Sequence, residues 1–480
     1  MLLRDLLNGV DVVSDCEGSI DVKGIKYDSR QVVDGDAFLC IKGFNTDGHR
    51  YAQEAVDKGA LVVIAEDEVN VKGAEVVIVK DTRVAMARMA ANFYGHPSRD
   101  FTLIGVTGTN GKTTVASAIR WVLKDMGYKT GLIGTINTVI GEKETPSAHT
   151  TPESVDLQRI FKEMRDQGVQ YAVMEVSSHS LALHRVDQCE FDVGVFTNLT
   201  QDHLDFHKTM ENYMKAKLKL FKMAKKSVIN VDDSYSEFFV QQANRPLCTY
   251  GINGGDFMAK DIVLGDSARF TLCHNGLTVP VKFPVPGRFS VYNALAAVAA
   301  IWSLGFPVKS IVESLEKFPG VKGRCELVDC AAPYKVVIDY AHTPDGLENI
   351  LRSVREFTAN RLILVFGCGG NRDRSKRPKM GEIAIKYADY VVVTSDNPRS
   401  EDPEAIISDI LKGIDGVAEN RYEVIVDRKE AIRRALSIAR KGDVVLLAGK
   451  GHETYQILGD RTIPFDERKI VKEILGGKDA

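Results

Sequence analysis

A short segment between 108 and 114 combines glycines, hydroxyls and one lysine in an order that suits phosphate binding. An apolar strand ending at Val106 precedes it and a helical pattern over 115–126 follows, which is the context of a phosphate loop. Backbone N–H groups at such a helix start surround phosphate oxygens, while a lysine neutralises the outer phosphates and a threonine hydroxyl holds Mg²⁺. The spacing departs from the standard Walker pattern, because Val106 stands where the leading glycine would, and a chance glycine-rich turn is the competing interpretation. The residues expected to contact ATP here are Gly108, Thr109, Asn110, Gly111, Lys112, Thr113 and Thr114.

A carboxylate is expected beside this loop. Glu175 ends the apolar stretch 171–175, which predicts a buried strand of the same sheet, and ligands of α/β proteins gather where such strands end. A hard cation that bridges phosphates usually takes one or two carboxylates, so Glu175 and Thr113 suffice for Mg²⁺. The alternative is a carboxylate that caps a helix, a role for which Ser177 and Ser178 compete.

Two histidines and a lysine further on have ambiguous chemistry. His203 and His207 follow the predicted strand 192–196, but no third nitrogen or sulfur ligand lies at zinc spacing, so a hydrogen-bonded structural histidine is an equal alternative. Lys217 lies on a lysine-rich helical stretch, for which a solvated basic face is the default explanation.

The bulk composition excludes several classes of protein. The 480 residues include 62 Lys and Arg against 65 Asp and Glu, and a formal charge of -3 provides no overall field for nucleic acid. Arg4 and Asp5 interrupt the first apolar segment, and the longest apolar stretch, 294–306, is shorter than the roughly 20 residues that cross a bilayer. The 8 cysteines form no C-x-x-C pair and are expected to be free thiols. We expect a cytoplasmic protein that binds neither nucleic acid nor membrane.

Two clusters of turn residues divide the chain, which is too long for one core. The first, 94–98, follows a helical pattern over 84–93, and the second, 318–323, follows helical patterns over 293–304 and near Ile311. They predict domains at 1–97, 98–321 and 322–480.

Strands alternate with helical patterns on both sides of the second cluster. Apolar runs at 102–106, 171–175, 192–196 and 227–231 predict a mostly parallel central sheet with helices on both faces. Runs at 335–339, 362–366, 390–394 and 444–447 predict a Rossmann-like C-terminal domain. The stretch 256–282 is β-like, with glycine and asparagine turns, and is expected to decorate the central domain. The fold class is therefore α/β.

In this order the motifs resemble those of the Mur ligases, the ATP-dependent amino-acid ligases of peptidoglycan precursor synthesis, over essentially the whole chain. The resemblance implies a central P-loop ATPase domain between an α/β N-terminal UDP-binding domain and a C-terminal domain that receives the amino acid. It also implies ATP and Mg²⁺, and a monomer that acts on small-molecule substrates. The motifs are TGTNGKTT (107–114), HTTPE (149–153), MEVSSH (174–179), FTNLTQDHLDFH (196–207), YMKAK (213–217), the Gly323-Arg324 turn, DYAHTPD (339–345) and AGKGHE (448–453).

The resemblance assigns roles that the residues alone do not. Lys112, Glu175, His203 and Lys217 become catalytic, with Lys217 carbamylated so that it holds a second Mg²⁺ beside His203. Asn293 resembles the adenine contact, and Arg324 and Asp339 resemble the contribution of the third domain to ATP binding. The residues that resemble contacts to UDP-N-acetylmuramoyl-L-alanyl-D-glutamate are Ser29, Phe44, Asn45, Thr46, Thr150, Thr151, Ser177 and Arg185.

The third substrate is indicated by the segment Asp396-Asn397-Pro398-Arg399 after the strand 390–394. In the family this segment marks members that add meso-2,6-diaminopimelate, and a guanidinium suits the carboxylate that distinguishes this amino acid from lysine. Arg377, Gly449 and Glu453 would complete the pocket, with Glu453 pairing an ammonium group.

Three alternatives stay open. A lysine-adding ligase of the same family is the nearest. Folylpolyglutamate synthases share the phosphate loop and the three-domain plan, but they are not expected to carry the terminal motifs. A nucleotide-dependent switch without ligase activity would leave Arg377, the segment 396–399 and Glu453 unexplained.

Overall fold

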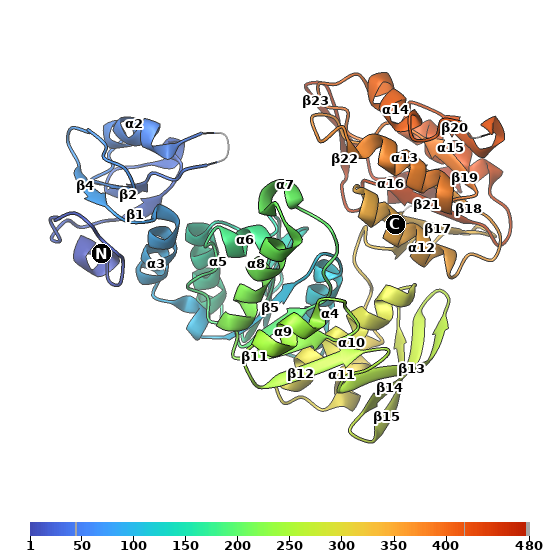
Figure 1. The fold of residues 1–480 in the computed structure, drawn as a ribbon, viewed down its shortest axis with the longest axis horizontal. Coiled ribbons are helices and arrows are strands. Elements are labelled where there is room, and N and C mark those ends of the chain that lie inside the picture. The colour runs from blue at the N-terminus through green and yellow to red at the C-terminus, as the bar shows by residue number, and fades with distance from the viewer. Residues whose placement is uncertain (44–45, 417, 477–480) are drawn as a thin grey trace.

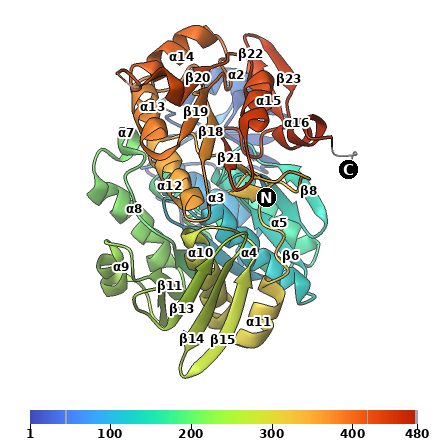
Figure 2. The same cartoon turned by 90° about the vertical axis from the view of Figure 1, so that its right-hand side faces the viewer.

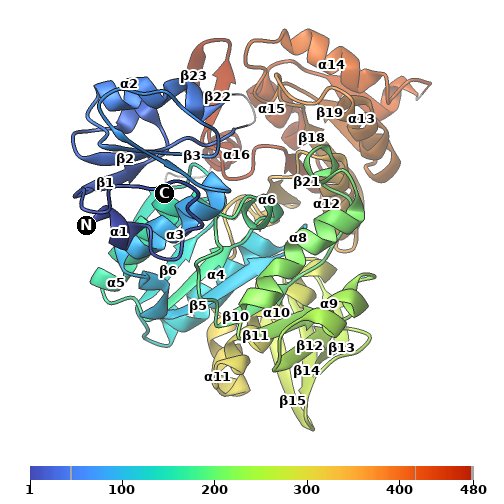
Figure 3. The same cartoon turned by 60° about the vertical axis from the view of Figure 1, so that its left-hand side comes forward.

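The computed structural model describes residues 1–43, 46–416 and 418–476, which form three α/β units in sequence order (Figure 1). The first and last units both lie over one side of the central unit (Figures 1 and 3). The expected α/β class with three domains is confirmed, while the exact domain boundaries stay a prediction. None of the helices in the described residues is both long and apolar enough to cross a membrane.

A four-stranded parallel sheet in the order β1-β2-β3-β4 forms the first unit. Its long helix, α3, begins where the Asp81 carboxylate accepts the N–H groups of Arg83 and Val84, and it ends at Gly95 in the left-handed region. The elements are α1 (Leu3–Leu6), β1 (Gly24–Lys26), η1 (Ser29–Gln31), β2 (Asp36–Leu39), η2 (Gly48–Tyr51), α2 (Ala52–Asp57), β3 (Val62–Ala65), β4 (Glu75–Ile78), α3 (Thr82–Tyr94) and η3 (Pro97–Arg99).

The central unit contains an 11-stranded sheet in the order β15-β14-β13-β12-β11-β10-β5-β9-β6-β7-β8. Strand β5 lies between β9 and β10, all parallel, so the ends of three neighbouring strands meet at one edge. The elements are β5 (Thr102–Thr107), α4 (Lys112–Asp125), β6 (Thr130–Ile133), β7 (Asn137–Ile140), β8 (Lys143–Pro146), α5 (Ser154–Asp166), β9 (Tyr171–Glu175), α6 (Ser178–Ala182), β10 (Val193–Phe196), α7 (Leu204–His207), α8 (Met210–Met223), β11 (Lys226–Asn230), α9 (Ser236–Gln242), β12 (Leu247–Gly251), β13 (Phe257–Leu264), β14 (Ala268–His274), β15 (Leu277–Phe283), α10 (Arg288–Ser303) and α11 (Val308–Leu315).

Helices cover both faces of this sheet, as the alternating apolar patterns predict. Buried residues of α4 and α10 pack on one face and those of α5 and α8 on the other. The β-like stretch 256–282 does more than decorate the domain, because β13 joins the sheet by parallel pairing with β12, and β14 and β15 extend it further by antiparallel pairing (Figure 2).

The third unit has a six-stranded sheet in the order β16-β17-β21-β18-β19-β20, parallel except for β16. Helices α12, α13 and α14 pack on one face, and α15 and α16 on the other. The elements are β16 (Glu326–Leu327), β17 (Lys335–Asp339), α12 (Pro344–Arg355), β18 (Leu362–Phe366), α13 (Lys376–Tyr387), β19 (Tyr390–Val393), α14 (Pro403–Leu411), η4 (Glu419–Arg421), β20 (Tyr422–Val424), α15 (Arg428–Ile438), β21 (Val444–Ala448), β22 (Tyr455–Leu458), β23 (Arg461–Pro464) and α16 (Glu467–Ile474).

Candidate functional site

The glycine-rich loop connects β5 to α4, and its backbone requires glycine at two positions. Gly108 has φ +151° and Gly111 has φ +87°. A Cβ on Gly108 would lie 1.9 Å from Thr197 Oγ1, and one on Gly111 would lie 2.7 Å from Asn293 Oδ1. The loop is therefore held close to two side chains that come from other elements, and the first turn of α4 is left facing the sheet edge.

Lys112 at the start of α4 folds back over this loop. Its Nζ donates to the carbonyl oxygens of Gly108 and Thr109, at 2.9 and 2.8 Å. Burial lowers the pKa of this ammonium group. Asn110 and Asn198 exchange two hydrogen bonds, N to Oδ1 at 2.9 Å and Nδ2 to O at 3.2 Å. These four hydrogen bonds define the shape of the loop.

Glu175 lies where the sequence places it, at the end of β9 and buried beside the loop. Its Oε2 accepts the Thr113 hydroxyl at 2.9 Å and the Thr135 hydroxyl at 3.0 Å, and its Oε1 accepts the Thr135 N–H at 2.8 Å. The capping alternative is wrong, because the side chain of Ser177 caps α6 by accepting the Ser180 N–H. Glu175 and Thr113 therefore form an oxygen-rich pair at the first turn of α4.

His203 lies just before α7, and it is near Lys217 of α8. The ring of His203 is half-exposed, with Nε2 3.4 Å from Asp202 Oδ2, and burial lowers its pKa. Lys217 is buried, with Nζ 4.5 Å from the centre of the Tyr213 ring, and no carboxylate pairs with it among the described residues. Burial, with Lys112 as a neighbouring cation, holds the pKa of Lys217 well below its usual range.

His207, in contrast, is the hydrogen-bonded structural residue that the alternative interpretation describes. Its Nε2 lies 2.8 Å from Ser178 Oγ, which links α7 to α6. This contact stabilises the loop that carries His203.

The donor set suits Mg²⁺ and ATP in two respects. No cluster of three or more His, Cys, Asp or Glu suited to a metal occurs in 1–43, 46–416 or 418–476, so Glu175 and Thr113 are a minimal set that phosphate oxygens would complete. Asn293 is buried on α10 against the loop, and its Nδ2 has no hydrogen-bond partner among the described residues. A buried donor without a partner is costly, and a nucleotide acceptor would satisfy it.

Four further predicted residues gather next to Glu175. Thr151 Oγ1 donates to the Glu175 carbonyl at 2.8 Å and accepts the Ser177 N–H at 3.2 Å. Arg185 donates to the Thr151 carbonyl at 3.0 Å, and Thr150 Oγ1 lies 3.1 Å from Thr135 Oγ1. Three hydroxyl groups and one guanidinium group therefore lie together beside Glu175, next to the phosphate loop.

The residues predicted to face uridine belong to the first unit. Ser29 Oγ donates to Glu54 Oε1 at 3.4 Å, and Thr46 Oγ1 donates to the Tyr51 hydroxyl at 3.2 Å. Phe44 and Asn45 lie outside the described residues, so their predicted contacts stay a prediction.

Arg324 shortly precedes β16, and Asp339 ends β17, the antiparallel neighbour of β16 in the third unit. Asp339 accepts the N–H groups of Cys325 and Ala341 at 2.7 and 2.8 Å. Burial raises the pKa of this carboxyl. The Arg324 guanidinium lies 5.1 Å from the centre of the Tyr340 ring, and its Nε is buried without a partner among the described residues.

The predicted amino-acid site is assembled from two loops of the third unit, one after β19 and one after β21. Asn397 Nδ2 donates to Glu453 Oε2 at 2.9 Å. Gly449 has φ +115°, and a Cβ there would lie 2.8 Å from Asp396 Oδ2. Pro398 belongs to the same tight set, because its carbonyl oxygen lies 1.9 Å from where a Cβ on Gly370 would be.

The two predicted arginines of this site differ. Arg399 is half-buried, and among the described residues it donates only to carbonyl oxygens, those of Gly370 and Asn397, at 2.9 and 3.4 Å. Arg377 is fully buried and already pairs with two carboxylates, Glu401 at 2.9 Å and Asp409 at 3.1 Å. Its Nε is buried without a hydrogen-bond partner among the described residues, so a contact with an amino acid through this N–H would leave both ion pairs intact.

Three polar side chains of the site carry no separate signal in the sequence. Asn198 and Lys450 lie inside the motifs 196–207 and 448–453, and Thr135 follows β6 at the same sheet edge as Glu175. Only their contacts distinguish them from neighbouring polar residues.

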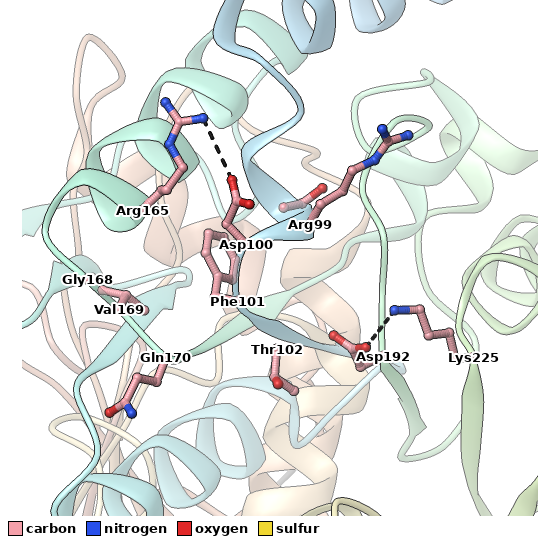
Figure 4. Close-up of a pocket in the computed structure, with 11 residues that line it drawn as sticks. Arg99, Asp100, Phe101, Thr102, Arg165, Gly168, Val169, Gln170, Asp192 and Lys225 are labelled. Carbon is pink, nitrogen blue, oxygen red and sulfur yellow. Dashed lines mark hydrogen bonds and ion pairs between the residues drawn. The ribbon is translucent and has the colours of Figure 1, made fainter.

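A surface pocket lies at the opposite edge of the central sheet, before β5, β9, β10 and β11 (Figure 4). Its three cations are paired, Arg99 with Glu190 at 2.7 Å, Arg165 with Asp100 at 3.7 Å and Lys225 with Asp192 at 2.9 Å. It contains none of the predicted site residues.

Three family models match the chain. They are the Mur ligase family, catalytic domain, over residues 21–94, the Mur ligase middle domain over 106–301, and the Mur ligase, glutamate ligase domain over 323–451.

Full-length relatives match as well. The chain is 53% identical, over 99% of both chains, to UDP-N-acetylmuramoyl-L-alanyl-D-glutamate--2,6-diaminopimelate ligase of Caldanaerobacter subterraneus subsp. tengcongensis. It is 49% identical, again over 99% of both, to the protein of the same name from Clostridioides difficile. A solved structure of a ligase with this name superposes with a TM-score of 0.72 at 33% identity, covering 99% of each chain.

Proposed function

The chain belongs to the Mur ligase family, and from that premise we propose that it joins 2,6-diaminopimelate to UDP-N-acetylmuramoyl-L-alanyl-D-glutamate with ATP. The product is the UDP-linked tripeptide of peptidoglycan synthesis, with ADP and phosphate. The observation that carries the proposal is the pairing of Glu175 with Thr113 beside the loop 108–114, in a chain that also presents an Arg399 without a carboxylate partner among the described residues. The Glu175–Thr113 pair suits the binding of Mg²⁺ and ATP. Arg399 suits the recognition of an additional carboxylate.

The first half-reaction activates the carboxylate. A side-chain carboxylate oxygen of the bound dipeptide attacks the γ-phosphorus of ATP, the bond to the ADP oxygen breaks, and an acyl phosphate forms. Backbone N–H groups of 108–114 and Lys112 hold the phosphates, and Asn293 orients the base. Phosphoryl transfer depends on the positioning of the reactants and on the stabilisation of charge, and the loop 108–114 would supply both.

Mg²⁺ is proposed at Thr113 and Glu175, with a second site at His203 and a carbamate on Lys217. Bound Mg²⁺ neutralises phosphate charge during transfer. The lowered pKa of Lys217 favours its neutral amine, the form that adds CO₂, and the carbamate would replace a buried cation by an anionic ligand.

In the second half-reaction the amine of the amino acid attacks the acyl carbon, the bond to phosphate breaks, and the nitrogen loses a proton. Thr150, Thr151, Ser177 and Arg185 would hold the dipeptide beside the loop, and Ser29 and Thr46 would hold the uridine end. Because the amino-acid loops belong to the third unit, approach of that unit to the loop 108–114 would exclude water from the acyl phosphate.

Diaminopimelate is favoured over lysine by the state of Arg399. Lysine would leave this guanidinium with only carbonyl acceptors, whereas diaminopimelate offers a carboxylate. Since Arg399 is half-buried, the loss corresponds to about 1.5–3 kcal/mol, and therefore to roughly ten- to a hundredfold discrimination.

A phosphate-release assay tests the proposal. We expect ATP-dependent phosphate release that requires both the UDP-linked dipeptide and diaminopimelate, with the tripeptide detected by mass. Release that is indifferent to both acceptors would instead support the nucleotide switch. Equal kcat/KM for lysine would support the lysine-adding alternative.

We further propose that the protein acts as a cytoplasmic monomer. A single species of one-chain mass in light scattering supports this, and a stable dimer at assay concentration contradicts it.

A further inference from the structure

Lys450 lies at the centre of the amino-acid site and has no role in the proposal so far. It follows Gly449 in the loop after β21, and its side chain is 0% exposed. Its Nζ lies 3.1 Å from Asn397 Oδ1, 3.1 Å from Glu453 Oε2 and 3.6 Å from Asp396 Oδ1. A buried ammonium group needs such partners, because an unpaired charge there is expensive.

Lys450, Asn397 and Glu453 close a triangle of hydrogen bonds. Lys450 can only donate and an ionised Glu453 can only accept, so the Asn397 amide between them has one possible orientation. Its Oδ1 faces Lys450 and also accepts the Ile457 N–H at 3.0 Å, while its Nδ2 donates to Glu453 at 2.9 Å. Without the lysine, Glu453 would lose its charged partner in the triangle and keep only the hydrogen bond from Asn397.

The triangle leaves two groups for a ligand. Glu453 Oε2 receives two donors, whereas its Oε1 has no partner among the described residues. One N–H of the Asn397 amide is likewise unpaired in that part of the chain. The centres of the Tyr455 and Phe465 rings lie 5.8 and 5.9 Å from Lys450 Nζ, so aromatic groups also border the ammonium group.

We propose that Lys450 is a positioning residue of the amino-acid site, which holds Glu453 and Asn397 in the orientation that receives the ammonium and carboxylate groups of the incoming amino acid. This inference rests on the proposed function. It makes Lys450 a determinant of amino-acid affinity without contact to ATP or to the UDP-linked substrate.

The test is steady-state kinetics of the full-length Lys450→Met variant, whose unbranched side chain is one atom shorter and carries no charge. We expect KM for diaminopimelate to rise roughly tenfold or more, because charge-assisted hydrogen bonds are lost, with KM for ATP and for the UDP-linked dipeptide unchanged within about twofold. Lys429→Met is the matched control, since Lys429 lies on α15 of the same unit, is 37% exposed and, in the part of the chain that the structure describes, pairs only with Glu473. It should leave all three KM values unchanged.

Two further variants separate positioning from folding. Lys450→Ala assayed with added propylamine should regain part of its amino-acid affinity, because the free ammonium can enter the cavity, whereas neutral propanol should not restore it. Lys450→Met/Glu453→Gln removes the unpaired carboxylate and should recover thermal stability but not affinity.

An unchanged KM for diaminopimelate in folded Lys450→Met overturns the inference, and so does an equal rise for all three substrates. If the wild-type protein forms no tripeptide at all, the proposed function fails instead, and binding of diaminopimelate measured by calorimetry in wild type and Lys450→Met still tests the role of Lys450.

Discussion

Lys217 is predicted to be required for catalysis through the negative charge of its carbamate and not through a positive charge. A buried lysine without a carboxylate partner among the described residues is unfavourable as a cation. Lys217→Ala should lose at least about a hundredfold in kcat, as removal of a charge-stabilising group does, and added acetate or formate should restore part of it. Kinetics with and without the carboxylate measure this. An unmodified amine in both intact mass and high-resolution density of an active wild-type enzyme would refute the assignment.

Arg399 acts on a different substrate and should affect only that one. Arg399→Ala removes the guanidinium that lacks a carboxylate partner among the described residues, so kcat/KM for diaminopimelate should fall roughly ten- to a hundredfold. The value for lysine should change little, and nucleotide binding should stay constant. Competition between the two amino acids in wild type and variant measures the ratio. An equal loss for lysine would mean that Arg399 supports the loop rather than the substrate.

At the scale of elements, the β5–α4 connection depends on Gly108. Gly108→Ala places a methyl group 1.9 Å from Thr197 Oγ1 at a φ of +151°, so the loop must move. We expect a loss of about 1–3 kcal/mol in the free energy of unfolding and loss of ATP binding. Gly265→Ala is the control, because nothing lies within 4 Å of its added Cβ. Thermal unfolding and nucleotide titration of both variants test this, and intact ATP binding in Gly108→Ala would contradict it.

At the scale of the whole molecule, Asp345 connects the third unit to the phosphate loop. This residue, in the first turn of α12, accepts Asn110 Nδ2 at 3.3 Å and Thr200 Oγ1 at 3.0 Å. Asp345→Ala should widen the distribution of distances between the central and third units, because it removes two polar contacts between them and leaves others such as Arg288 N–H with Glu356 and Lys335 with Asp266. Small-angle scattering and fluorescence transfer measure it. Asp345→Asn, which keeps an acceptor oxygen, should behave as wild type, and identical profiles for the alanine variant would contradict the prediction.

The fold was predictable because its signals are local. Apolar runs at 171–175, 335–339 and 362–366 coincide with β9, β17 and β18, since strands buried on both faces read as continuous apolar segments. The stretch 256–282 was predictable as β structure, but not as an extension of the central sheet, because strand pairing depends on partners distant in sequence.

By itself the sequence determined the residue types of the site and the edge where they belong. Gly108, Lys112, Thr113 and Glu175 follow from strand ends and loop composition, because the carboxyl ends of parallel strands meet at one edge. Only the tertiary structure decided how side chains pair. It separated His203 from the structural His207, placed Arg377 in ion pairs, and enclosed Lys450 between Asn397 and Glu453. Hydrogen bonds act over about 3 Å, so the partners of a buried polar group become defined only when distant loops fold against each other.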